Sequence, residues 1–429
     1  MCILLFTTAH PKYPLILLSN RDEFLHRKTA PAAYWEPEYP HIFSGRDMAR
    51  PEHGTWLGIT KTGRLAALTN FRESSSAAAI GEKSRGAMIT SFLTASPATS
   101  ITDSATDSAA VDVAETSVAD AESSATKFEA EFTGSEEFDA DTDADTSFES
   151  DADIQSDTQL TTTAPGLHPA PSPSPDNLTT QSWIHSMLRS GEMKGVGGFS
   201  MLCGTLRPNG IGGLEPLAVI SNRTEKRDEG VIEGTRWVCG NPGETRGLSN
   251  SLFDEPWNKV MVGEGLLKRV VEEDVAGAAG SQDCAADGDG GKDEDGEDAR
   301  ERLLEKCFQV LSTDTYPPIT ESSTYQSELD NLRESIFIPV FDVVKEGAPT
   351  PSPPEGYSSF PPKKHQMTEE ELERWRQSPR LYGTAQQTVV LLDKRGYVTY
   401  VERTLYDSNA KPVEGRREVR TRFRIPGWA

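Results

Sequence analysis

The 429-residue sequence lacks several features that would place a chain in a membrane or outside the cell. No stretch approaches the ~20 apolar residues of a membrane-spanning helix, and the N-terminus has neither the basic region nor the long apolar run of a secretion signal. The five cysteines show no paired spacing, which argues against a disulfide framework and indicates no metal site. Basic stripes interleaved with aromatic residues, typical of nucleic-acid binding, are also missing. We therefore expect an intracellular, cytoplasmic protein without a transmembrane segment, a nucleic-acid partner, a metal or a cofactor.

The net charge of −24 is concentrated in two segments. Residues 101–180 carry a net charge of −18 and residues 271–300 carry −9, which leaves +3 on the rest of the chain. Such acidic, Ser- and Gly-rich sequence cannot bury enough apolar surface to offset the entropy of ordering. We predict one domain over residues 1–429, with disordered insertions at 97–180 and 274–300 and a Pro-rich, charged loop at 346–378.

Cys2 directly follows the initiator methionine, where a structural thiol is seldom useful. Methionine is readily removed before a side chain as small as that of cysteine. The product would carry a thiol and a free α-amine on one residue, and such an amine titrates near ~8. The amine can accept the thiol proton and later return it, so Cys2 would supply both a nucleophile and its base.

A predicted hairpin brings further polar groups to Cys2. The apolar runs Ile3–Phe6 and Leu15–Leu18 are typical of strands, and the two prolines within His10–Pro14 indicate the turn between them. A hairpin centred on Pro11 and Lys12 places Cys2 opposite position 21.

The segment Asn20–Glu23 would then lie beside the thiol. Arg21 would lower the pKa of the Cys2 thiol, Asp22 would hold the α-ammonium, and strand alternation would turn Glu23 away. The alternative is that Asn20–Glu23 is a polar strand end with a structural ion pair, and that Cys2 is a small buried or a lipidated residue.

Several short motifs follow this hairpin in a fixed order. Five of them lie within the first seventy-odd residues: Met1-Cys2-Ile3, Asn20-Arg21-Asp22-Glu23-Phe24, Ser44-Gly45-Arg46-Asp47, Gly54-Thr55-Trp56-Leu57-Gly58 and Ala67-Leu68-Thr69-Asn70-Phe71-Arg72. Others continue to the C-terminal end: Ser84-Arg85-Gly86, Ser221-Asn222-Arg223, Gly247-Leu248-Ser249-Asn250, Pro256-Trp257-Asn258-Lys259-Val260 and Tyr382-Gly383-Thr384. Together they resemble the NRDE family, also called the transport and Golgi organisation protein 2 family.

The remaining hydrophobic patterns predict strands near both ends of the chain and helices between them. Strands are expected at 55–60, 64–69, 199–204, 216–222, 235–240, 388–393 and 396–404, and helices at 84–95, 251–271 (interrupted at Pro256 and Gly263–Gly265) and 301–311. This order suits an α+β fold of two stacked antiparallel sheets covered by helices. The family resemblance implies the same architecture, an αββα sandwich like that of N-terminal-nucleophile hydrolases.

The resemblance also implies a set of site residues. Cysteine hydrolases of this fold, such as the choloylglycine hydrolase group, use an N-terminal cysteine with a nearby arginine and aspartate, which would be Cys2, Arg21 and Asp22 here. They also use asparagine side chains as oxyanion donors, and the candidates are Asn70 and Asn250. The sequence departs from the family at one position of the site. Many members have an arginine after Tyr-Gly-Thr, whereas this chain has Ala385.

Two classes of function remain open from the sequence. The resemblance implies an intracellular protein that acts in Golgi organisation and protein secretion, through handling of lipid, acyl-CoA or haem, with association to the Golgi or mitochondria. The site residues instead suggest an amidohydrolase or acyltransferase that uses Cys2 on C–N amide bonds. In either case we expect a small-molecule ligand, an acyl compound or haem.

Overall fold

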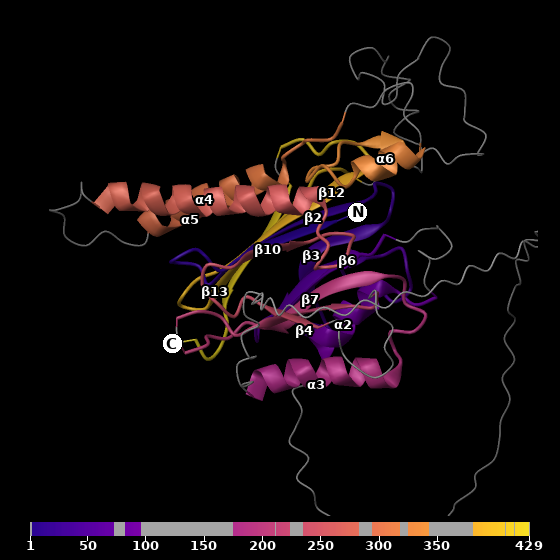
Figure 1. Ribbon diagram of the computed structural model, residues 1–429, viewed down its shortest axis with the longest axis horizontal. Coiled ribbons are helices and arrows are strands. Elements are labelled where there is room, and N and C mark those ends of the chain that lie inside the picture. The colour runs from indigo at the N-terminus through magenta and orange to yellow at the C-terminus, as the bar shows by residue number, and fades with distance from the viewer. Residues whose placement is uncertain are drawn as a thin grey trace, which may run out of the picture. The chain divides into compact units, whose positions relative to one another are not determined.

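The computed structural model (Figure 1) places the N-terminal hairpin at the centre of a layered fold. All described residues belong to the compact unit formed by Met1–Thr99 and Pro171–Ala429. The structure describes residues 2–72, 82–95, 175–210, 212–223, 235–282, 294–317, 325–342, 381–407, 409–415 and 417–428.

One antiparallel sheet contains the hairpin and the C-terminal strands. Its order is β10 (Thr245–Leu248), β1 (Ile3–Thr7), β2 (Leu15–Phe24), β12 (Leu381–Leu392), β13 (Tyr397–Thr404) and β14 (Glu418–Arg424), and β11 (Phe341–Asp342) also pairs with β12. The second sheet is antiparallel too, in the order β3 (Thr29–Trp35), β4 (Tyr39–Asp47), β5 (Leu57–Thr60), β6 (Arg64–Asn70), β7 (Phe199–Thr205), β8 (Leu217–Ser221) and β9 (Arg236–Val238).

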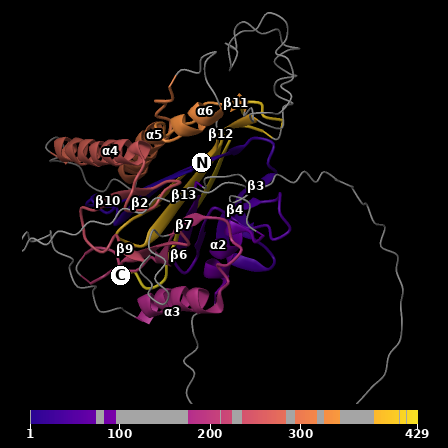
Figure 2. The same ribbon diagram turned by 45° about the vertical axis from the view of Figure 1, so that its right-hand side comes forward.

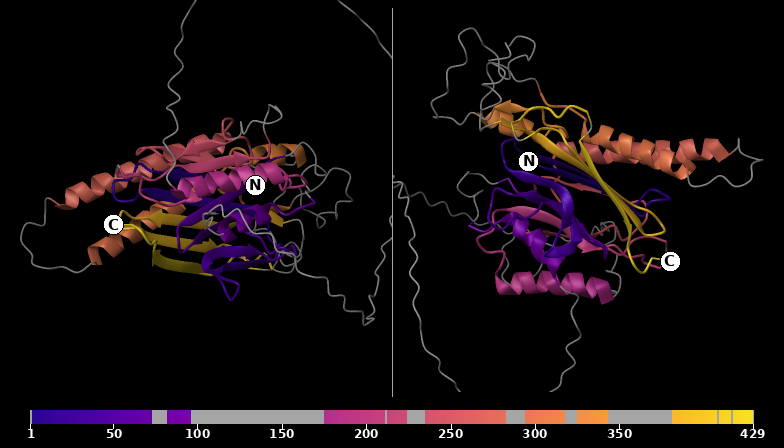
Figure 3. Two further views of the ribbon diagram at one scale, coloured as in Figure 1. Left: turned by 90° about the horizontal axis from the view of Figure 1, so that it is seen from below. Right: turned by 180° about the vertical axis from the view of Figure 1, so that it is seen from behind.

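Helices cover the outer face of each sheet (Figures 2 and 3). Helices α4 (Asn258–Gln282) and α5 (Glu294–Leu311) pack on the first sheet, and α2 (Arg85–Thr94) and α3 (Pro175–Ser190) pack on the second. A short helix, α6 (Tyr325–Asn331), precedes β11. The predicted α+β architecture of two antiparallel sheets covered by helices is therefore confirmed.

Strand alternation assigns the apolar side chains of β1 to two cores. Leu4 and Phe6 face the second sheet, whereas Ile3 and Leu5 face the α4 and α5 layer. Each fully buried side chain of this size contributes roughly 1.5–3 kcal/mol. Because both faces of β1 are covered, its sequence is a continuous apolar run rather than an alternating one.

The predicted hairpin register is confirmed. Ile3 pairs with Asn20 and Thr7 with Ile16, so continuation of the register places Cys2 opposite Arg21. A shift by one residue would turn the apolar set of each strand to the wrong core, so burial on both faces fixes the register.

Two expectations differ from the structure. Helix α4 runs unbroken through Gly263 and Gly265, because a Cβ on Gly263 would lie 2.7 Å from Leu5 Cδ1 and only glycine allows this close approach to β1. The described ends of the two expected disordered insertions are helical. Most of 97–180 and 274–300, and all of 346–378, lie outside the described residues, but their ends belong to α3, α4 and α5. Among the described helices, none is both long and apolar enough to cross a membrane.

Candidate active site at Cys2

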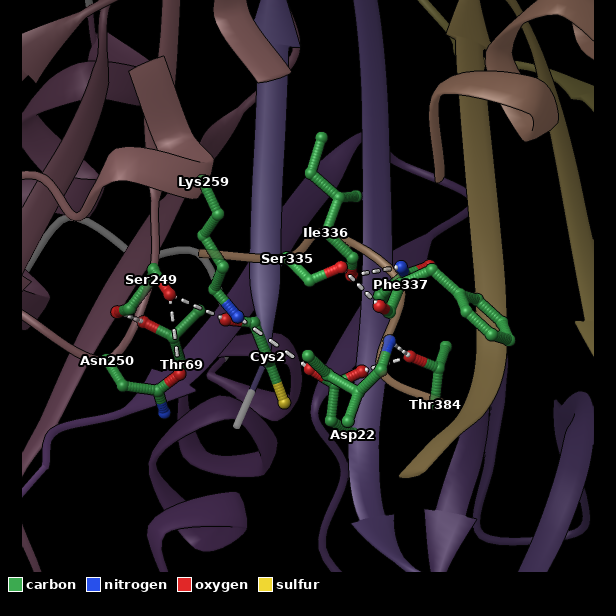
Figure 4. A network of polar contacts seen from close by, with 12 residues as sticks. Cys2, Asp22, Thr69, Ser249, Asn250, Lys259, Ser335, Ile336, Phe337 and Thr384 are labelled. Atoms are coloured by element: carbon green, nitrogen blue, oxygen red, sulfur yellow. Dashed lines mark hydrogen bonds and ion pairs between the residues drawn. The ribbon is translucent and has the colours of Figure 1, made fainter. Parts of the chain in front are cut away.

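The candidate site lies where β1 begins. Cys2 is 9 % exposed, and its main-chain oxygen accepts a hydrogen bond of 3.0 Å from Ser249 Oγ (Figure 4). Ser249 follows β10 directly, and its own main-chain oxygen accepts a bond of 2.6 Å from Thr69 Oγ1. The backbone of Cys2 is thus held by segments from both sheets.

Asp22 is a buried carboxylate next to Cys2, held from three sides. Its Oδ1 accepts a hydrogen bond of 2.7 Å from Thr384 Oγ1, and its main-chain oxygen accepts one of 2.9 Å from the Tyr382 hydroxyl. Its Oδ2 lies 3.8 Å from Lys259 Nζ at the start of α4 (Figure 4). The Tyr382-Gly383-Thr384 motif therefore orients Asp22, and α4 supplies its counter-charge.

A β-bulge in β12 makes this arrangement possible. Thr384 pairs with Asp22 and Gln386 pairs with Arg21, so Ala385 is the extra residue. Without the bulge, Thr384 and Gln386 would face the same side of the sheet, whereas Arg21 and Asp22 face opposite sides. The bulge thus lets β12 donate a hydrogen bond to Asp22 from Thr384 and accept one from Arg21 at Gln386. The extra residue, Ala385, occupies the position where many family members have arginine.

Arg21 points into the layer between the sheets. Its guanidinium donates a hydrogen bond of 3.0 Å to Gln386 Oε1 and lies 4.5 Å from the centre of the Trp56 ring. The ring occupies space that only glycine leaves free, because a Cβ on Gly45 would lie 2.8 Å from it. The prediction that Glu23 turns away is wrong, since Glu23 Oε2 lies 3.9 Å from Arg21 Nη2 on the same face of β2.

The electrostatics of the thiol also differ from the prediction. Burial raises the pKa of Cys2, and the nearby Arg21 charge opposes this only weakly. Burial likewise raises the pKa of Asp22, against the opposing charge of Lys259 and the hydrogen bond from Thr384. For Lys259, burial lowers the pKa, and the acidic groups Asp22 and Cys2 oppose the shift. Burial therefore favours the protonated form of the Cys2 thiol, which as a nucleophile would require a base.

The two predicted asparagines lie side by side at the edge of the site. Asn70 ends β6, and Asn250 follows Ser249. Asn250 Nδ2 donates a hydrogen bond to the main-chain oxygen of Asn70. One N–H of the Asn250 amide therefore holds the strand end, and its second N–H is the donor left for a ligand.

Lys259 and Arg85 are charged residues of the site to which the sequence assigned no role. Both lie inside motifs that carry the family resemblance, which is the signal that pointed to them. Arg85 opens α2 and interacts electrostatically with Cys2. The motif that contains Arg85 packs closely against the Gly54 motif, because a Cβ on Gly54 would lie 2.7 Å from the carbonyl carbon of Gly86.

Comparisons with known proteins agree with these motifs. The family described as "Transport and Golgi organisation 2" matches residues 1–126 and 173–407. The chain is 40 % identical over 100 residues to the transport and Golgi organization protein 2 homolog of Bos taurus and 41 % identical over 100 residues to that of Homo sapiens. An uncharacterised protein of Saccharomyces cerevisiae is 42 % identical over 98 residues. These alignments cover 22 % of this chain and 31–35 % of the relatives, about a third of their length. Because the family match spans most of the sequence, the chain belongs to the transport and Golgi organisation 2 family.

Proposed function

We propose that Cys2 is the nucleophile of an N-terminal-cysteine amidohydrolase or acyltransferase, and that the chain acts through it in Golgi organisation. The observation that carries the chemical part is the position of a buried thiol directly before the central strand β1, opposite Arg21 and close enough to Asp22 for their charges to interact. A thiol whose pKa is raised by burial needs a base, and after removal of Met1 the α-amine of the same residue is the nearest one.

The reaction follows from these groups. The α-amine takes the proton of Sγ, and Sγ attacks the carbonyl carbon of an amide substrate. The carbonyl oxygen becomes an oxyanion, which the second N–H of the Asn250 amide or the Asn70 side chain would stabilise. The C–N bond then breaks, and the leaving amine takes the proton from the α-ammonium. Water releases the thioester in a hydrolase, and another nucleophile does so in an acyltransferase.

The finer architecture supports this proposal. Two antiparallel sheets face each other, helices cover both outer faces, and the candidate nucleophile directly precedes an inner strand of one sheet. This is the arrangement expected of an N-terminal-nucleophile hydrolase. The names of the relatives support a role in Golgi organisation, and they concern proteins of which the alignments cover about a third.

The buried state of the thiol favours a second candidate function. A protonated thiol is a poor nucleophile, so a chain that keeps Met1 would have a site without a base. In that case the same site would bind and hand over an acyl compound or haem without chemistry.

Mass spectrometry of the purified chain distinguishes the two candidates. The hydrolase proposal predicts loss of Met1 and reaction of the unfolded chain with 2-cyanobenzothiazole, which requires an amine and a thiol on one residue. In the folded protein, an activated acyl probe should acylate Cys2 before the other four cysteines. Cys2→Ser is the control for the site of labelling. Retained Met1, or a Cys2 no faster than the other thiols, would contradict the proposal and favour ligand handling.

A further inference from the structure

Lys259 is a buried, charged residue of the site that has no role in the reaction steps proposed above. Its side chain is 0 % exposed, and Nζ makes no hydrogen bond within the part of the chain that the structure describes. The single close charge is Asp22 Oδ2 at 3.8 Å, which is beyond hydrogen-bond distance. Taking an ammonium out of water is costly unless another charge compensates it. A lysine retained in this position at the site therefore needs a reason.

We propose that Lys259 is a positioning residue of the Cys2 site, which neutralises the Asp22 carboxylate and thereby keeps the Cys2 α-amine unprotonated at neutral pH. This inference rests on the proposed function, because it requires a free α-amine on Cys2. Lys259 contacts no reacting atom in this account, and it acts through Asp22 and through its own charge.

The charge balance of the site supports this role. Asp22 and Lys259 together are neutral, so a proton on the α-amine would add a positive charge that no further carboxylate of the described residues offsets. Like charges at short range disfavour each other, and burial disfavours any charged form. Both effects lower the pKa of the amine below its ordinary value near ~8. A base must be unprotonated to accept the thiol proton, so a lower pKa makes more of it available.

The other charged groups that face the site act in the same direction or are already paired. Arg21 approaches from β2 and Arg85 from α2, and both are positive. The Glu23 carboxylate lies 3.9 Å from Arg21 and offsets its charge, and Glu402 also faces Arg21. Asp22 is thus the one described carboxylate whose charge acts on Cys2 directly.

A structural role alone would predict something different. The main chain of Lys259 also donates a hydrogen bond of 3.0 Å to the Arg333 carbonyl, which every substitution retains. If the side chain only filled space, the apolar variant Lys259→Met would leave the titration of the amine unchanged. Lys259→Arg keeps the charge, and Lys268→Met removes an exposed lysine from the same helix, so these are matched controls.

The experiment titrates the amine itself. Competitive acetylation with acetic anhydride across pH, measured by mass spectrometry of the N-terminal peptide, gives the midpoint for the Cys2 amine. We expect the midpoint of the parent at least one pH unit below the ordinary ~8. Lys259→Met should raise it by about one unit or more, which corresponds to roughly ten-fold less free amine near neutral pH. Lys259→Arg and Lys268→Met should stay close to the parent.

A second pair of variants covers the case in which Lys259→Met does not fold. Asp22→Asn should lower the midpoint, and adding Lys259→Met to it should raise the midpoint again. Neither protein buries the Asp22 carboxylate without the lysine that compensates its charge, which removes the main reason for misfolding. If the Cys2 amine is free but Lys259→Met does not change its midpoint in either the parent or the Asp22→Asn protein, this inference is overturned and the proposed function is not. Retention of Met1 in the parent would overturn the inference together with the proposed function.

Discussion

Glu402 provides the sharpest test of the electrostatics between the two sheets. It lies on β13, is 1 % exposed, and its Oε1 accepts a hydrogen bond of 2.9 Å from the main-chain N–H of Ala32 on β3. Burial raises the pKa of Glu402 to about 7, although Ala32, Arg21 and Tyr400 favour the ionised form. Burial outweighs these contacts, so the fold is most stable when this carboxyl group is protonated.

The sign and size of the effect follow from linkage. A carboxyl whose pKa is raised on folding contributes stability that is fully present below its unfolded value of 4.5 and is lost as the pH rises through about 7. The difference of about 2.5 units corresponds to about 3 kcal/mol of stability lost by pH 8. Glu402→Gln keeps the oxygen that accepts from Ala32 but cannot ionise. We expect it to match the parent near pH 5 and to exceed the parent's free energy of unfolding by about 2–3 kcal/mol near pH 8.

Urea unfolding of both proteins at the two pH values measures this difference. Glu418→Gln is a control of opposite sign. Partial burial disfavours its charge, but Arg403 and Arg420 outweigh this and lower its pKa, so Glu418 contributes stability near neutral pH that is lost as the pH falls. If Glu402→Gln shifts stability equally at both pH values, the substitution acts through packing and the argument from ionisation fails.

Two further substitutions test the supports of the site by thermal or urea unfolding. Thr384→Val should lower the free energy of unfolding by about 3 kcal/mol, because it removes the hydrogen bond to the Asp22 carboxylate and leaves the buried main-chain N–H of Ile338 unpaired. Thr399→Val, on β13, is the matched control. An equal loss of stability in Thr399→Val would refute the roles assigned to the two hydrogen bonds. Gly263→Ala should destabilise by roughly 1–3 kcal/mol by overpacking a buried leucine of β1. Gly265→Ala, where a Cβ meets nothing, should stabilise α4 by up to about 1 kcal/mol, so equal effects at the two glycines would contradict the described packing.

The sequence predicted the elements whose pattern is local. The hairpin could be placed to the residue because two apolar runs flank a proline-containing turn, and its register then follows from its centre. Strands β3 and β14 were not predicted. β3 contains Pro31, and exposed arginines alternate along β14 (Arg420, Arg422 and Arg424), so neither resembles an apolar strand. Their strand state depends on pairing with β4 and β13, which no local pattern records.

The same distinction applies to the site. Arg21 and Asp22 could be assigned because the hairpin alone brings them to Cys2. Thr384 and Lys259 come from segments far away in the sequence, and their contacts with Asp22 depend on the bulge in β12 and on how α4 packs. The predicted effect of Arg21, a lower thiol pKa, is present, but the net shift is upward for a related reason. The charge of Arg21 could be read from the sequence, whereas the burial that outweighs it is a property of the whole fold.

The place of Cys2 at the start of a central strand explains why charges from both layers meet there. Within β2, Arg21 faces the second sheet and Asp22 faces α4, so a residue in mid-strand could contact one of them but not both. Cys2 directly precedes β1, and continuation of the register puts its side chain on the Arg21 side. At such an end, the free α-amine of the proposed mechanism can turn toward Asp22 while the thiol stays on the Arg21 side. An N-terminal nucleophile needs this division, because its nucleophile and its base are a few bonds apart and still require different surroundings.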